Sequence, residues 1–280
     1  MSLSSLLAAI EDRLSRAGID SARTEAEVLA CHVLGLTRSD LHLNGSEALT
    51  PKLEARINDA ASLRAERYPL QYITGECEFY SLPFTVREGV FIPRPETEVL
   101  VESVLRAVRR PRALLEVGSG CGVVCVCLAR ELQPGRVVAT DISPAAARVT
   151  AENAARHGVR DIIQVVVGDG MDFLRRGGQF DLFVCNPPYV AASEIEGLEP
   201  EVRDYEPRAA LDGGVDGLEF IRRIVPALPS ILMSGALAAL EIAPDQTEAV
   251  AGMLAGSGVR GIECVRDLCG RNRVITARMP

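Results

Sequence analysis

The residues best suited to chemistry in this 280-residue chain are Asn186-Pro187-Pro188-Tyr189, which directly follow the apolar run Phe180–Cys185. An asparagine amide carries both an acceptor and donors, a proline carries no N–H, and a tyrosine offers a flat ring. At the mouth of a strand, such a set can grip a planar –NH2 group and aim its nitrogen outward. The pattern therefore indicates methyl transfer to an amide or to an exocyclic base amine.

A glycine-rich turn follows a second apolar run. Residues 114–117 lead into Gly118-Ser119-Gly120-Cys121-Gly122, and an apolar helical pattern comes next. Glycines let the backbone turn sharply and approach a ligand closely, and the start of a helix offers unpaired N–H groups. Val123 stands where a dinucleotide-binding fingerprint needs Gly or Ala, and no phosphate-loop lysine follows. We therefore expect a nucleotide-like ligand other than a dinucleotide.

Acidic residues stand at the ends of the predicted strands. Glu116 belongs to the run before the glycine turn, Asp141 follows residues 137–140, and Asp169 follows residues 163–168. Such acids line the ligand crevice of an open α/β sheet and can accept hydrogen bonds from ribose hydroxyls. An acidic rim suits a ligand with a positive charge and no phosphate. S-adenosylmethionine, which becomes S-adenosylhomocysteine on methyl transfer, fits better than NAD or ATP.

Together these motifs resemble the class I S-adenosylmethionine-dependent methyltransferases, and the full set is similar to the HemK/PrmC family of release-factor glutamine methyltransferases. The likeness is close over residues 65–280, and the helical front end agrees in type. The Asn-Pro-Pro-Tyr motif alone is shared with DNA adenine and RNA guanine methyltransferases. The more selective motifs are YPLQYITG (68–75), FYSLPF (79–84), IPRPETE (92–98), VRDYEPRAAL (202–211), GGVDG (213–217) and DLCGRNR (267–273).

The resemblance implies a substrate and roles for the site residues. The substrate would be the glutamine of the Gly-Gly-Gln loop in class 1 peptide chain release factors, methylated on its side-chain amide nitrogen. The Asn186 side-chain oxygen and the Pro187 carbonyl would accept its two N–H bonds, and Tyr189 would pack on the amide plane. No strong general base is evident or required. The expected catalytic residues are Asn186, Pro187 and Tyr189, and the expected substrate-binding residues also include Pro188, Arg94 and Thr97.

The cofactor residues implied by the family carry one open question. Gly170 stands where some relatives place a large aromatic residue against the adenine, and Met171 or Phe173 would have to fill that space. Glu116 and the Gly-Ser-Gly-Cys-Gly turn depart only mildly from the family pattern. The expected cofactor-binding residues are Glu116, Gly118, Ser119, Gly120, Cys121, Gly122, Asp141, Asp169, Gly170 and Asn186.

The elements that must position these residues fall into three parts. Residues 1–70 show helical periodicity and predict a small helical bundle that docks the substrate. Residues 71–95 form short extended runs and predict a hairpin-like connector. Residues 96–280 alternate five apolar runs with helical patterns and end in a possible hairpin. They predict an α/β methyltransferase domain of the Rossmann-like class, with a seven-stranded, mostly parallel sheet.

Composition limits the partners. Asp and Glu outnumber Lys and Arg by 38 to 30, which gives a net charge of -8, the wrong sign for a protein that neutralises phosphates. We therefore expect no direct binding of duplex nucleic acid. The absence of about 18 consecutive apolar residues predicts no membrane span, so we expect a soluble, cytoplasmic monomer without an export signal. Eight cysteines without a paired CxxC pattern predict reduced core thiols and no metal site.

Alternatives remain at this stage. A ribosomal-protein glutamine methyltransferase would use nearly the same motifs and differ in its helical domain. A nucleic-acid amine methyltransferase would be expected to carry a target-recognition domain or a basic insertion. A catalytically silent binding module would be expected to have lost Asn186 or the glycines, and this chain retains both.

Overall fold

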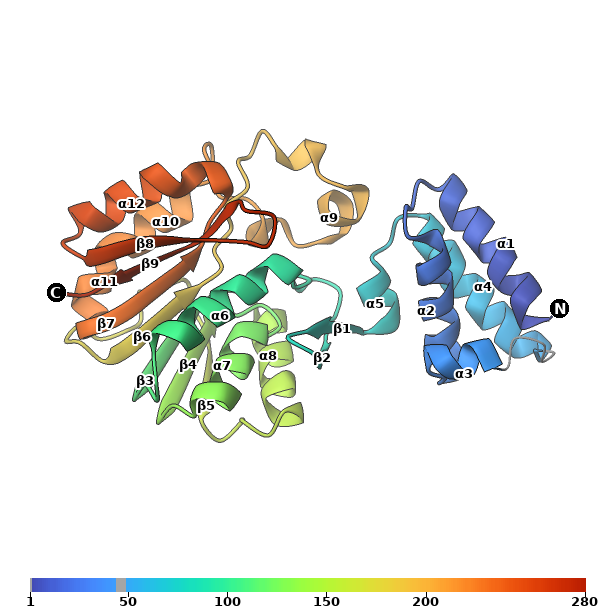
Figure 1. Ribbon diagram of the computed structural model, residues 1–280, viewed down its shortest axis with the longest axis horizontal. Coiled ribbons are helices and arrows are strands. Elements are labelled where there is room, and N and C mark those ends of the chain that lie inside the picture. The colour runs from blue at the N-terminus through green and yellow to red at the C-terminus, as the bar shows by residue number, and fades with distance from the viewer. Residues whose placement is uncertain (1, 44–48) are drawn as a thin grey trace. The chain divides into compact units, whose positions relative to one another are not determined.

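The computed structural model describes residues 2–43 and 49–280 and divides them into two compact units (Figure 1). The first unit comprises the described residues up to Glu76 together with Glu199–Tyr205. The second comprises Cys77–Leu198 and Glu206–Pro280. The chain thus leaves the second unit after Leu198 and returns to it at Glu206.

The first unit is a helical bundle around its own apolar core. Leu6, Ile10 and Leu14 are fully buried along one face of the first helix, as the helical periodicity predicts. Residues 71–74, which we expected to be extended, instead form a one-turn helix between Pro69 and the left-handed Gly75, too short to show periodicity. The helices of this unit are α1 (Leu3–Arg16), α2 (Ala22–Leu34), α3 (Arg38–Leu43), α4 (Pro51–Ala65), α5 (Leu70–Thr74) and α9 (Pro200–Tyr205).

Ion pairs hold α9 in the helical unit. The Arg64 guanidinium is 4% exposed and donates to Glu25 at 2.5 Å and to Glu201 at 2.7 Å. Arg67 donates to the other oxygen of Glu201, so the two guanidiniums share one carboxylate. The ring of Tyr205 also meets that of Tyr68 edge-on, with centroids 5.1 Å apart. Residues distant in the sequence therefore complete this unit.

The second unit is built on a seven-stranded sheet in the order β5-β4-β3-β6-β7-β9-β8. The first five strands of this order run parallel, and β9 is antiparallel to both of its neighbours. The predicted seven-stranded, mostly parallel sheet is confirmed. Its strands are β3 (Ala113–Val117), β4 (Arg136–Asp141), β5 (Ile163–Val167), β6 (Phe180–Cys185), β7 (Leu232–Glu241), β8 (Arg260–Arg266) and β9 (Asn272–Arg278).

Helices cover both faces of this sheet, and each face has its own apolar core (Figure 1). Successive strand residues point to opposite faces, so Leu182 and Val184 join one core whereas Phe183 and Cys185 join the other. The hairpin of β1 (Glu76–Phe79) and β2 (Leu82–Thr85) packs Phe79 and Phe84 into the first core. That face carries α6 (Glu98–Ala107), α7 (Val123–Leu132) and α8 (Pro144–Arg156). The other carries α10 (Glu219–Ile224), α11 (Leu228–Ile231) and α12 (Thr247–Gly256).

The cysteines differ partly from the expected core thiols. Cys121, Cys125, Cys127 and Cys185 are buried, but Cys264 on the edge strand β8 and Cys269 in the following turn are exposed. An edge strand and a turn leave side chains uncovered that a central strand would bury. Among the described residues, no helix combines the length and the apolar character needed to span a bilayer.

Candidate active site

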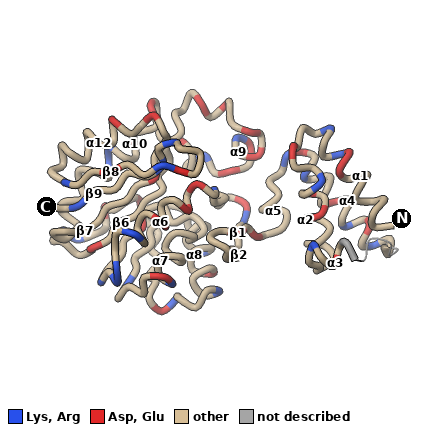
Figure 2. Tube along the Cα trace, in the orientation of Figure 1, with Lys and Arg blue, Asp and Glu red and all other residues tan. Residues whose placement is uncertain are grey.

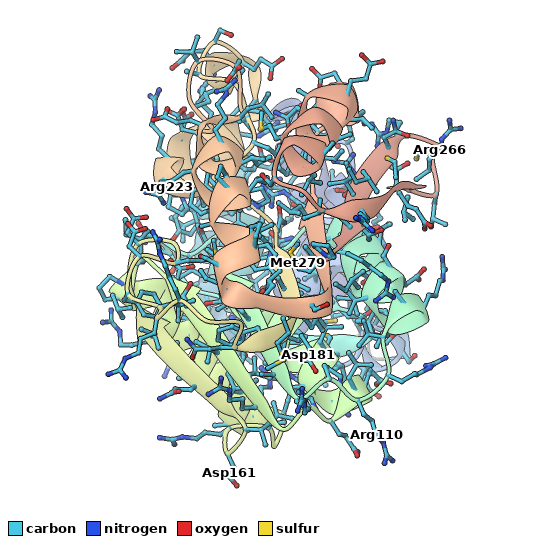
Figure 3. All side chains as sticks on the ribbon, turned by 90° about the vertical axis from the view of Figure 1, so that its left-hand side faces the viewer. Arg110, Asp161, Asp181, Arg223, Arg266 and Met279 are labelled. Atoms are coloured by element: carbon cyan, nitrogen blue, oxygen red, sulfur yellow. The ribbon has the colours of Figure 1, made fainter. Side chains whose placement is uncertain are left out.

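The predicted site residues lie where the parallel strands end. Glu116 is in β3, Asp141 is the last residue of β4, and Asn186 follows β6, all at the carboxyl edge of adjacent strands. In Figure 3, Arg110 and Asp161, which precede β3 and β5, lie at the bottom of the view and mark the opposite edge of the sheet. The sheet thus gathers acids and amide where an open α/β fold binds its ligand.

The glycine turn has a backbone that only glycine adopts without strain. Gly118, Gly120 and Gly122 have φ angles of 76°, 56° and 85°. The Gly120 N–H donates to one oxygen of Asp141 at 2.8 Å, and the Ser143 N–H donates to the other at 2.8 Å. Burial raises the pKa of Asp141, and these two N–H groups oppose that rise. Asp141 therefore fixes the turn against the end of β4.

The turn also adjoins the Asn-Pro-Pro-Tyr motif. A β-carbon on Gly118 would lie 3.6 Å from the backbone oxygen of Asn186, whereas one on Gly120 would meet nothing within 4 Å. The glycine turn thus lies in ordinary contact distance of the Asn186 backbone and is open at Gly120. An open cradle of backbone beside a carboxylate fits a nucleoside that carries no phosphate.

Five members of the predicted cofactor set are buried, namely Glu116, Ser119, Cys121, Gly122 and Gly170. Glu116 is 3% exposed, accepts the Cys125 N–H at 3.1 Å, and has its pKa raised to about 8 by burial. It lies beneath the open rim on which we expected it, because its carboxyl turns toward the start of α7. The Ser119 hydroxyl shares a 3.0 Å hydrogen bond with Thr150, and Cys121 belongs to the first core.

Asp169 has a partner that sequence reasoning missed. Arg223 donates to both of its oxygens, one at 2.7 Å, and lowers the pKa of the carboxyl. Arg223, labelled in Figure 3, also lies beside Gly170, where an added β-carbon would approach its guanidinium to 3.3 Å. Of the two residues that could replace an aromatic at 170, Met171 is buried in the second core, whereas Phe173 is 43% exposed. Of the two, Phe173 is therefore the one whose ring has exposed surface.

The amide of Asn186 has a defined neighbour. Its Nδ2 donates to the Thr97 hydroxyl at 3.1 Å, and its Oδ1 has no partner among the described residues. Thr97 is 2% exposed and lies behind Asn186. Pro187 is buried and Pro188 is half-buried. The structure thus leaves an amide oxygen able to accept a hydrogen bond from a ligand.

Tyr189 is held at both its ring and its backbone. Its hydroxyl donates to Glu241 Oε1 at 3.1 Å, and its carbonyl accepts from Gln246 Nε2 at 3.0 Å. Burial and the nearby Glu241 raise the pKa of Tyr189, so the phenol keeps its proton. Gly217 also packs against the Tyr189 carbonyl. Glu241 could have been found as another acid at a strand end, but nothing local in the sequence indicated Gln246.

Arg94 holds a segment of backbone. It forms an ion pair with Glu206 and donates to the Ile92 carbonyl at 2.8 Å, and Glu206 accepts the Ile92 N–H at 3.2 Å. Burial raises the pKa of Glu206, and the Arg94 charge opposes that rise. These contacts fix the segment that delivers Thr97 to Asn186, and they join the motif of residues 92–98 to that of residues 202–211.

Comparisons with known proteins cover both units. Residues 5–75 match the family model described as the PrmC N-terminal domain, and residues 83–198 match the methyltransferase small domain. A release factor glutamine methyltransferase of Geobacter sulfurreducens is 43% identical over 267 residues, which are 95% of this chain and 93% of the relative. The protein of the same name from Moorella thermoacetica is 41% identical over 280 residues, 99% of this chain and 98% of the relative.

Solved structures agree with the fold. The ribosomal protein L11 methylase of Lactobacillus delbrueckii subsp. bulgaricus has a TM-score of 0.51 at 21% identity and covers 70% of this chain and 84% of its own. The 16S rRNA N2 G1207 methyltransferase of T. thermophilus, solved with AdoMet and guanosine, has a TM-score of 0.54 at 17% identity and covers 73% of this chain and 50% of its own. At these identities the likeness concerns the class I methyltransferase fold alone.

Proposed function

This chain belongs to the family of release factor glutamine methyltransferases, and we propose that it methylates the side-chain amide nitrogen of the glutamine in the Gly-Gly-Gln motif of peptide chain release factors. The observation that carries the proposal is the Asn186 amide, whose Nδ2 is engaged by Thr97 and whose Oδ1 is left to accept. The Asn186 backbone lies beside the glycine turn at Gly118, and the turn is open at Gly120. A ligand amide and a nucleoside would therefore meet at one edge of the sheet.

The residues present fit S-adenosylmethionine as the methyl donor. The cofactor, when bound, supplies an electrophilic methyl group on a positively charged sulfur. The open turn at Gly120 and the carboxylate of Asp141 would hold its nucleoside, and Asp169 with Phe173 would border the base. We assign the remaining contacts to the turn residues Gly118 to Gly122, to Gly170 and to Asn186, with the buried Glu116 supporting the start of α7 behind them.

The protein's contribution is to orient a weak nucleophile. An amide nitrogen reacts poorly because its lone pair is delocalised into its carbonyl group. Acceptance of its two N–H bonds by Asn186 Oδ1 and the Pro187 carbonyl would aim the nitrogen and favour positive charge on it during the reaction. The Tyr189 ring, with its hydroxyl bound to Glu241, would pack on the amide plane and exclude water.

The division into units and the distribution of charge bear on the partner. We assign docking of the release factor to the helical part, residues 1–70, followed by the connector 71–95 and the catalytic part 96–280. Figure 2 shows Lys and Arg interspersed with Asp and Glu along both units, which suits a protein partner better than duplex nucleic acid. The protein is expected to act in the cytoplasm as a monomer.

Transfer of labelled methyl from S-adenosylmethionine tests the proposal. Purified release factor should be labelled, and the same factor with its Gly-Gly-Gln glutamine changed to alanine should not. Ribosomes in a parallel reaction test the ribosomal-protein alternative. Equal labelling of the two release factors would refute the proposed acceptor.

The variant Asn186→Ala tests the acceptor site within the enzyme. Loss of a group that stabilises developing charge typically lowers kcat by about 10²–10³-fold, so we expect turnover to be nearly abolished. Cofactor binding, measured by calorimetry, should remain largely in place because the glycine turn and Asp141 are untouched. An unchanged kcat would remove Asn186 from the mechanism.

A further inference from the structure

Glu241, at the end of β7, is a fully buried carboxyl beside the Asn-Pro-Pro-Tyr motif. Its Oε1 accepts the Tyr189 hydroxyl at 3.1 Å. Its Oε2 has no hydrogen-bond partner in the described part of the chain. The Thr97 hydroxyl lies near enough to the carboxyl to lower its pKa. A buried carboxyl with an unfilled oxygen is expensive to keep, which calls for a role beyond packing.

The hydrogen bonds around Glu241 have directions that its charge determines. A carboxylate can only accept, so the Tyr189 hydroxyl points its proton toward it, and the nearby Thr97 hydroxyl interacts favourably with the charge only when its proton also faces the carboxylate. A hydroxyl has one proton, so a Thr97 that donates to Glu241 can only accept from Asn186. The amide of Asn186 must then offer its Nδ2 to Thr97, as observed, and its Oδ1 to the opposite side.

We propose that Glu241 is a positioning residue whose carboxylate sets, through Thr97 and Tyr189, the orientation of the Asn186 amide and of the Tyr189 ring. The proposal rests on the proposed function of these residues as the grip for the substrate amide. Glu241 is fully buried, so it acts through these two residues and not by direct contact with a ligand. It selects the one of two amide orientations in which Asn186 accepts from the substrate, because a rotated amide would present N–H groups to N–H groups.

The surroundings of Glu241 make this selection dependent on pH. Burial raises the pKa of Glu241 to about 7, and the Thr97 and Tyr189 hydroxyls together with the Arg273 charge oppose the rise, whereas Glu96 adds to it. Once protonated, Glu241 can itself donate to a hydroxyl, so Thr97 is no longer obliged to accept from Asn186. The productive orientation is therefore enforced above the pKa of this carboxyl and relaxed below it.

Steady-state kinetics of the full-length protein between about pH 5.5 and 9 test the proposal, with release factor as substrate. Wild-type kcat should fall toward low pH with an apparent pKa near 7. Glu241→Gln, which offers one acceptor and one donor where the carboxylate offers two acceptors, should lower kcat at pH 8 by about tenfold or more. In this variant kcat should no longer fall toward low pH, and KM should stay within about threefold of the wild-type value.

Two further comparisons separate positioning from folding. Thr97→Ser keeps the hydroxyl and should retain kcat within about threefold, whereas Thr97→Val should lose most of it. Asp181→Asn is a matched carboxyl-to-amide change on β6 at the opposite edge of the sheet, where Asp181 accepts the N–H groups of Arg112 and Ala113. It should leave kcat and the pH profile unchanged.

The outcomes distinguish the two proposals. Wild-type protein that methylates no release factor refutes the proposed function, whatever the variants do. An active wild type together with a Glu241→Gln variant that keeps its kcat, or whose kcat still falls toward low pH, refutes the role of Glu241 alone. If Glu241→Gln does not fold, equal kcat for Thr97→Ser and Thr97→Val gives the same refutation.

Discussion

Replacing Gly217 with alanine would place a methyl group where the Tyr189 backbone already lies. A β-carbon at Gly217 would be 2.3 Å from the Tyr189 carbonyl oxygen and 2.6 Å from Gln246 Nε2. Gly217 also has a φ of 73°, a left-handed conformation that alanine adopts only with strain. The change therefore acts on the backbone of the Asn-Pro-Pro-Tyr motif without altering any of its side chains.

The size of the effect follows from these contacts. Left-handed backbone costs alanine about 1–2 kcal/mol, and overpacking adds about 1–3 kcal/mol. A less flexible unfolded chain offsets about 0.4–1 kcal/mol, which leaves a net loss of about 3 kcal/mol. For a unit of this size, that corresponds to a melting temperature lower by roughly 6–12 °C. To relieve the clash, the distance between the added β-carbon and the Tyr189 carbonyl oxygen must grow from 2.3 Å to at least 3.0 Å. A displacement of about 1 Å in a substrate-positioning group can lower kcat by about 10²-fold.

Thermal unfolding and kcat for release factor methylation, measured on the same preparations, check both numbers. Gly252→Ala is the matched control, because Gly252 lies inside α12 with nothing within 4 Å of an added β-carbon. It should stabilise the protein by up to about 1 kcal/mol and leave kcat unchanged. The reasoning would be refuted by a Gly217→Ala protein whose melting temperature lies within about 2 °C of wild type and whose kcat lies within about twofold of it.

Two further predictions concern buried ionisable groups. In urea unfolding, Arg64→Ala should destabilise the helical unit by about 3 kcal/mol, because Glu25 and Glu201 lose a buried cation. The control Arg16→Ala, which breaks an exposed ion pair, should change the free energy of unfolding by less than about 0.5 kcal/mol. Equal effects of the two variants would contradict the prediction. Because burial raises the pKa of Glu116 to about 8, its folded form holds a proton that the unfolded form releases near the ordinary glutamate pKa of 4.5. The free energy of unfolding should therefore fall as pH rises toward 8 and level off above it, and between about pH 6 and 9 wild type should lose about 2–3 kcal/mol more than Glu116→Gln; parallel curves would show that burial does not perturb Glu116.

Much of the catalytic fold was predictable because its signals are local. Residues 113–117 coincide with β3, because a central strand buried on both faces reads as a mostly apolar stretch. Residues 163–167 coincide with the edge strand β5, which is partly exposed and is recognised by its β-branched residues. The glycine turn lies beside Asn186, as expected from neighbouring strands whose carboxyl ends share an edge. Here the pattern of residue types was sufficient, because the position of each residue follows from its own strand.

The support behind the site was not predictable, because it joins residues far apart in the chain. Tyr189 depends on Glu241 and Gln246, which come from the end of β7 and the turn after it. Asp169 is paired with Arg223 of α10, and no spacing within the sequence indicates that partner. Residues expected to touch a ligand form a local sequence motif, whereas the residues that hold them in place are brought there by tertiary contacts and leave no such motif. The cofactor and substrate contacts themselves stay predictions.

The return of Glu199–Tyr205 to the helical unit means that the two units cannot be separated by one cut in the gene. A fragment that begins at Cys77 would keep α9 but lose Arg64 and Arg67, leaving the Glu201 carboxylate without its cations. A helical fragment that ends at Glu76 would in turn lose the Tyr205 ring. Exchange of the helical unit between relatives would therefore require transplanting two stretches of chain together, and a chimera that moves only the first should inherit a mismatched α9.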